Sequence, residues 1–122
     1  MEHCTIVTVS IATDSSGDFT DTIAAPHGRL LQYRVVDTDL AAGTDLDLVG
    51  TVTGFVYINH DSMGSTLERS PRAPTHDVLG AASLYAGSGL AVEDYMYVAE
   101  NLDLTIANGG DTKTGKLYLW FG

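Results

Sequence analysis

The segment KLYLWF, Lys116–Phe121, is apolar in both of its alternating positions. Successive side chains of a β-strand point to opposite faces, so three apolar side chains would share one face while Tyr118 and Trp120 share the other. A strand that is apolar on both faces lies at the centre of a domain or is covered by another subunit. The segment therefore predicts a β fold with a central C-terminal strand, and it makes Tyr118 and Trp120 candidate partner contacts.

Seven other segments have the length and composition of strands. β-Branched and aromatic residues are frequent in them, and apolar residues often alternate with polar ones, as at Val7, Val9 and Ile11. About eight short strands at close spacing favour an all-β fold, an antiparallel, jelly-roll-like β-sandwich in a single domain, 1–122. The seven segments are 4–13, 19–25, 29–36, 45–53, 55–59, 95–99 and 102–107.

Turn residues and changes in alternation give local expectations. The polar run 14–18 between the first two segments predicts a hairpin. In the third segment, strict alternation places Leu30 and Tyr33 on opposite faces. The alternation of the fourth segment changes phase at Gly50, which predicts a β-bulge at that residue.

The long connection 60–94 does not alternate, and its part 70–89 holds two of the three prolines. Pro71 and Pro74 predict an extended backbone, because proline fixes φ and disfavours helix in the residue before it. Asp77 is a candidate cap for a short helix, 78–86. A connection of this length usually carries function or contacts.

Two of the six basic residues, Arg69 and Arg72, flank Pro71 in a chain with 16 acidic residues. Arginine presents planar, bidentate donors that fit carboxylates at an interface. The alternative is that both arginines pair with acidic residues of this chain. The full set of candidate contacts is Arg69, Pro71, Arg72, Pro74, His76, Tyr95, Tyr97, Tyr118 and Trp120.

The formal net charge of −10 weighs against two kinds of partner. Such a surface repels phosphate backbones and anionic membranes, so we expect no nucleic acid and no membrane partner. No apolar run approaches the roughly 20 residues of a membrane span, and we expect no signal peptide. The single cysteine, Cys4, cannot form an internal disulfide, which fits a reducing cytoplasm.

No motif assembles a catalytic set or a cofactor site. Gly110–Lys116 matches G-x-x-x-x-G-K, but Leu117 replaces the Ser or Thr that holds Mg²⁺, and a strand is expected where the motif requires a helix. His60 and His76 each precede an aspartate without a nucleophile-elbow pattern. We expect no enzyme activity and no cofactor.

Metal binding is only partly excluded by the sequence. Its one cysteine and four scattered histidines do not supply a zinc site. The alternative of a bound cation stays open for the aspartate-rich loop 37–47, because hard cations take carboxylates in flexible loops.

Motifs that carry a family resemblance follow one another along the chain. They are PRAPTHD at 71–77, GAA at 80–82, LYA at 84–86, Asp94-Tyr95, Val98-Ala99, Gly109-Gly110, Thr112-Lys113 and Gly115. This series resembles small structural proteins of tailed bacteriophages that are encoded among the head genes. The Thr- and Val-rich start of the chain and its Ser-Gly-Asp turn are similar to theirs as well.

The resemblance implies a virion protein that decorates, or cements, the outside of a phage head. Its expected partners are the major capsid protein and further copies of itself, most often as a homotrimer. It would be made in the host cytoplasm and located on the capsid exterior.

Two alternatives remain beside this expectation. The chain could be another virion component, such as a head-fibre base or a tail-associated protein. It could also be a carbohydrate-binding β-sandwich with a row of exposed aromatic residues, drawn from Tyr33, Tyr57, Tyr95, Tyr97, Tyr118 and Trp120.

Overall fold

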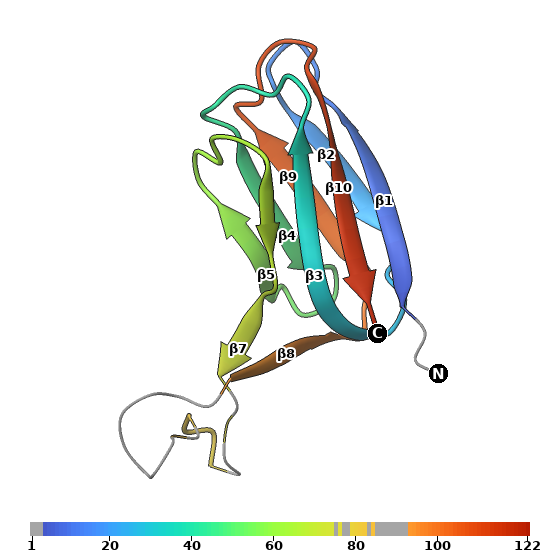
Figure 1. Cartoon of the computed structure of the whole chain (residues 1–122), viewed down its shortest axis with the longest axis vertical. Helices are drawn as coiled ribbons and strands as arrows, with labels where there is room; N and C mark the ends of the chain where they lie inside the picture. The colour runs from blue at the N-terminus through green and yellow to red at the C-terminus, as the bar shows by residue number, and fades with distance from the viewer. Residues whose placement is uncertain (1–3, 75, 77–78, 83, 85–92) are drawn as a thin grey trace.

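The computed structural model describes residues 4–74, 76, 79–82, 84 and 93–122. Within these residues the chain is all-β, with ten strands in two antiparallel sheets (Figure 1). The strands are β1 (Thr5–Ala12), β2 (Phe19–Ile23), β3 (Gly28–Asp37), β4 (Asp45–Gly50), β5 (Val56–His60), β6 (Leu67–Arg69), β7 (Arg72–Pro74), β8 (Glu93–Val98), β9 (Leu102–Ala107) and β10 (Thr114–Phe121).

The two sheets pack face to face as a β-sandwich. The six-stranded sheet has the order β1-β10-β3-β8-β7, and β6 pairs with the second half of β3. The four-stranded sheet has the order β2-β9-β4-β5 and lies behind β1, β10 and β3 in Figure 1. The predicted antiparallel β-sandwich is confirmed.

β10 is the central strand that its sequence predicted. It pairs with β1 along one edge and with β3 along the other. Leu117, Leu119 and Phe121 are buried between the sheets, whereas Tyr118 and Trp120 lie on the outer face and are half-buried. The core also contains the inward-facing residues Val9, Ile11, Ile23, Leu30, Tyr33, Val35, Leu46, Leu48, Ile58, Val98, Leu102, Leu104 and Ile106.

The hairpin expected at 14–18 is wrong. β1 pairs with β10 and β2 pairs with β9, so the first two strands belong to opposite sheets. The Asp14 carboxylate accepts hydrogen bonds from the Ser16 and Asp18 amides at 2.8 and 3.0 Å, which shapes a turn that crosses between the sheets. Gly17 has φ 81°, and a Cβ there would lie 2.9 Å from the Gly110 amide nitrogen.

The face assignment of the third segment needs correction. Trp120 lies opposite Gln32 and Phe121 lies opposite Leu30, so Leu31 is an extra residue in β3. This irregularity turns Leu30 to the same buried side as Tyr33.

The predicted position of the β-bulge, at Gly50, is also wrong. Leu46, Leu48 and Gly50 are all buried, so alternation in β4 continues to its last residue. The irregularity lies on the neighbouring β5, where Tyr57 is the extra residue between the pairs Leu48–Ile58 and Val49–Val56.

The long connection contains two short strands that the sequence did not predict. β6 pairs with β3, and β7 pairs with β8 to form an arm that projects from the lower end of the sandwich in Figure 1. The backbone between Pro71 and Pro74 is extended, as predicted. The described part of the expected helix, 78–86, is not helical: Gly80 has φ 85°, and Ala82 forms an antiparallel bridge with His76. Its other residues and the cap Asp77 lie outside the described residues.

Among the described residues, no helix is long and apolar enough to cross a membrane.

A polar contact joins the two sheets inside this apolar frame. The Tyr33 hydroxyl of β3 lies 2.5 Å from Nε2 of His60 of β5. Partial burial, and secondarily the positive charge of Arg69, lowers the pKa of His60 below its ordinary 6.5. A neutral ring can accept the tyrosine proton, whereas a protonated ring can only donate.

We predict that this contact makes stability depend on pH. Because the unfolded chain binds a proton at His60 near pH 6.5 and the folded protein binds it only at lower pH, the contribution is complete above pH 6.5. It is lost as the pH falls through the folded-state pKa. In thermal unfolding between pH 5 and 8, His60→Gln should flatten the pH dependence relative to the unsubstituted protein. Equal slopes for both proteins would contradict the prediction.

We predict that the same substitution, valine to alanine, costs much more stability at a buried valine than at an exposed one. Val35 is fully buried beside Leu117, whereas Val52 is 83% exposed. Val35→Ala should lower the free energy of unfolding by about 2 kcal/mol, from lost burial and an added cavity. Val52→Ala should change it by less than about 0.5 kcal/mol. Urea unfolding of both variants measures the difference, and similar values would contradict the assigned core.

Candidate functional site

The base of the arm gathers side chains from three strands on the outer face of the six-stranded sheet. Residues 96–98 of β8 pair with β3, and residues 93–95 pair with β7. Arg29 therefore lies opposite Tyr97, and Arg72 lies opposite Tyr95. Because alternate residues share a face, the two arginines and the two tyrosines lie on one side of the sheet.

Tyr95 is the centre of this group. The guanidinium carbon of Arg72 lies 4.6 Å from the centroid of its ring, and that of Arg29 lies 5.9 Å from it. Both distances are within the range of cation–π attraction. Arg72 also donates a hydrogen bond of 3.4 Å to the Tyr95 hydroxyl, and Arg29 donates one of 3.4 Å to the carbonyl of Gly122. We call Arg29, Arg72, Tyr95 and Tyr97 the Arg–Tyr cluster.

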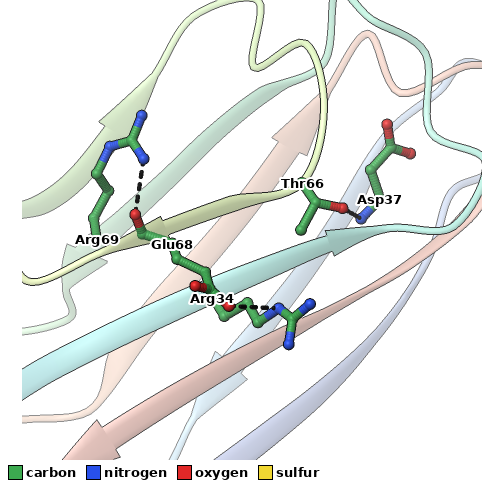
Figure 2. A network of polar contacts seen from close by, with 5 residues as sticks. All are labelled: Arg34, Asp37, Thr66, Glu68 and Arg69. Atoms are coloured by element: carbon green, nitrogen blue, oxygen red, sulfur yellow. Dashed lines mark hydrogen bonds and ion pairs between the residues drawn. The ribbon is translucent and has the colours of Figure 1, made fainter.

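The two arginines that the sequence singled out, Arg69 and Arg72, lie in different strands and contact different residues. Arg69 belongs to β6 opposite Tyr33 and donates a 2.8 Å hydrogen bond to the Glu68 carbonyl (Figure 2). The Glu68 carboxylate pairs instead with Arg34, at 3.0 Å. Within the described part of the chain, Arg34–Glu68 is the one ion pair between a basic and an acidic side chain. Arg72 is therefore not paired with a described carboxylate.

The other predicted aromatic residues lie on the same outer face. Tyr118 and Trp120 have ring centroids 6.1 Å apart, and Ile6 of β1 lies opposite Trp120. Arg29 pairs with Tyr97 on one side and exchanges backbone hydrogen bonds with Gly122 on the other. The face that carries Trp120 therefore continues through β3 to Tyr97, which is 64% exposed.

The remaining predicted contacts do not join the cluster. Pro71 is half-buried at the start of the arm, and Pro74 lies opposite Glu93. His76 is placed farther along the arm by its bridge to Ala82.

An apolar groove lies between the arm and the start of β5. Its volume is about 310 Å³, and the rings of Phe55 and Tyr57 pack edge to face 4.8 Å apart in its wall. It is lined by Thr53, Phe55, Tyr57, Ala73, Met96, Tyr97 and Glu100.

Glu100 fixes the turn that forms one wall of the groove. One carboxylate oxygen accepts hydrogen bonds from the Val52 and Thr53 amides, each 2.9 Å, and the other accepts from the Thr53 hydroxyl at 2.7 Å and the Tyr57 hydroxyl at 3.1 Å. The Thr53 hydroxyl and amide, followed by the other donors, lower the pKa of Glu100 to about 2. A Cβ on Gly50 would lie 2.4 Å from this carboxylate, so glycine lets the Glu100 side chain lie against the end of β4.

The catalytic and phosphate-binding hypotheses gain no geometric support. Thr114–Phe121 is a strand, so no helix follows the Gly110–Lys116 motif. His60 contacts Tyr33 rather than a nucleophile.

The hypothesis that the loop 37–47 binds a cation gains no geometric support either. Asp39 accepts the Thr114 amide at 2.6 Å, while Asp45 accepts from the Ser62 amide and the Asn108 side chain, each at 2.9 Å. The described part of the chain contains no group of three or more His, Cys, Asp or Glu that could hold a metal ion.

No family model matches the chain, and no curated protein or solved structure is significantly similar to it.

The side chains gathered on this face are of types that are common in protein interfaces. Arginine, tyrosine and tryptophan are the residues most enriched at the energetic centres of protein interfaces. Sequence reasoning found Arg72, Tyr95, Tyr97, Tyr118 and Trp120. It missed Arg29, Phe55, Met96 and Glu100, because their roles depend on which strands become neighbours.

We predict that Glu100 stabilises the protein in a pH-dependent way. Its pKa is about 2 in the folded protein and 4.5 ordinarily, so its contribution is present above pH 4.5 and is lost as the pH falls towards 2. Glu100→Gln should lower the melting temperature at pH 7 and reduce the difference between pH 5 and pH 2.5. The control Glu93→Gln removes a carboxylate outside this turn and should do neither. A melting curve of Glu100→Gln equal to that of the control would contradict the assignment.

Proposed function

We propose that this protein is a capsid decoration protein, which binds the outer surface of a tailed-phage head and stabilises it. The observation that carries the proposal is the outer face of the six-stranded sheet. It presents aromatic residues and arginines on a rigid sandwich, with an arm projecting beside them. A stabilising protein needs such a rigid body, together with contacts that reach its neighbours.

We also propose that the sandwich is a jelly roll. Apart from β7 and β8, its strands form the orders β1-β10-β3-β6 and β2-β9-β4-β5. Each of these eight strands lies in the opposite sheet from the one before it, except at the β4–β5 step. Jelly rolls occur in viral capsid domains and in lectins, so this connectivity supports a virion role without requiring it.

The decisive experiment locates the protein in purified particles of the virus whose genome encodes it. We expect mass spectrometry to find it in intact particles, in a fixed ratio to the major capsid protein. Cryo-electron microscopy should place its density on the head exterior. Density on the tail would favour another virion component, and absence from the particles would overturn the proposal. Specific binding on a glycan array would favour the carbohydrate-binding alternative.

We predict that the isolated protein is an oligomer, and specifically a trimer, of its 12.9 kDa chain. Tyr118 and Trp120 provide apolar contact area on the outer face, and Ile6 beside them is 56% exposed. Native mass spectrometry should show the trimer for the unsubstituted protein. Trp120→Ser should shift the population towards monomer, whereas the control Val52→Ser should not. A strictly monomeric protein at high concentration would contradict the prediction.

A further inference from the structure

We propose that the Arg–Tyr cluster is a carboxylate-binding site through which the six-stranded sheet docks on an acidic side chain of a partner protein. The inference deepens the proposed function. It rests on that function in one respect, the assumption that the partner is a capsid protein. It names the face that meets the partner and the chemistry that the partner presents.

The first argument is the geometry of the two arginines. Arg29 comes from β3 and Arg72 from β7, the two strands that flank β8, and both are exposed. Their guanidinium groups are directed to one ring, that of Tyr95. A guanidinium held in place loses less conformational entropy when it binds, and its planar N–H groups match the two oxygens of a carboxylate.

The second argument is that these arginines retain donors. Each guanidinium has five N–H groups. In the described part of the chain, Arg29 makes one side-chain hydrogen bond, to Gly122, and Arg72 makes one, to Tyr95. Arg34 differs, because Glu68 already neutralises it. In a chain with 16 acidic residues, Arg72, which no described side-chain carboxylate neutralises, favours a partner from outside.

The third argument is the separation of charge between the two outer faces. The register places four of the six basic residues on the outer face of the six-stranded sheet: Arg29, Arg34, Arg72 and Lys116. It places two acidic residues there, Glu68 and Glu93, so the strands of this face carry more basic than acidic side chains. The outer face of the four-stranded sheet carries three aspartates and no lysine or arginine from its strands: Asp45, Asp47 and Asp103. An acidic partner is therefore attracted to the first face and repelled by the second.

Other occupants fit this surface less well. A phosphate polymer or an anionic membrane carries a dense charge that the net −10 of the chain opposes at long range. Stacking the basic face of one copy on the acidic face of another joins opposite sides of the sandwich, which gives an open filament rather than a closed trimer. A protein surface supplies both a carboxylate and apolar groups, which can contact the exposed ring of Tyr97.

The experiment uses a defined acidic probe, the peptide acetyl-Glu-Leu-Glu-Leu-amide, with the full chain. In an NMR titration, we expect the peptide to shift the side-chain N–H signals of Arg29 and Arg72. The peptide with Gln in place of Glu should not shift them. Arg72→Glu should weaken peptide binding about tenfold or more, the range expected for a lost charged hydrogen bond. Arg72→Gln is the second variant, and melting temperatures establish that both remain folded.

The matched control reverses a charge on the other outer face. Asp103→Lys makes a change of the same size as Arg72→Glu and should leave peptide binding unchanged. The inference is overturned if the two variants weaken binding equally, if neither does, or if inorganic phosphate binds more tightly than the carboxylate peptide.

The same variants in a co-sedimentation assay with purified heads separate this inference from the proposed function. If heads bind the protein and Arg72→Glu does not weaken that binding, the site is wrong and the decoration function stands. If the peptide results hold and heads do not bind the protein, the decoration function is wrong and the carboxylate site stands.

Discussion

The whole sandwich depends on β10 lying between β1 and β3. This strand joins the two ends of the chain in one sheet, and its inward side chains Leu117 and Leu119 are fully buried against the second sheet. Apolar burial of this kind is the dominant favourable term in folding. The pairing continues to Gly122, which exchanges backbone hydrogen bonds with Arg29. The same strand that completes the core therefore also positions the start of β3, where the Arg–Tyr cluster begins.

The arm divides its two sides between different kinds of contact. Its outer side carries Arg72 and Tyr95, and its inner side contributes Ala73 and Met96 to an apolar groove. Glu100 closes that groove by accepting four hydrogen bonds from the β4–β5 turn and Tyr57. A carboxylate whose oxygens are already occupied in this way organises the backbone and is not a ligand site.

The proposed decoration function and the proposed carboxylate site both place partner binding on the outer face of a sheet rather than in a cleft. Such a face binds by combining a few aromatic and arginine side chains with rigid support from the sheet beneath them. Under these proposals, the charge separation between the sheets would orient the molecule on its partner. The acidic face would point to solvent, where its aspartates keep the particle surface hydrated and mutually repelling.

The sequence by itself determined the strands that are regular, and the tertiary structure decided their partners. Alternation and two-sided apolarity predicted all eight longer strands and the central place of Lys116–Phe121, because these patterns reflect burial directly. The crossing at Asp14, the extra residues Leu31 and Tyr57, and the short strands β6 and β7 depend on pairing between distant segments, which leaves no local pattern. The same holds for the site. Composition pointed to Arg72 and the tyrosines, but only the pairing of β8 with both β3 and β7 brings Arg29 to Tyr95 and leaves Arg69 with Glu68.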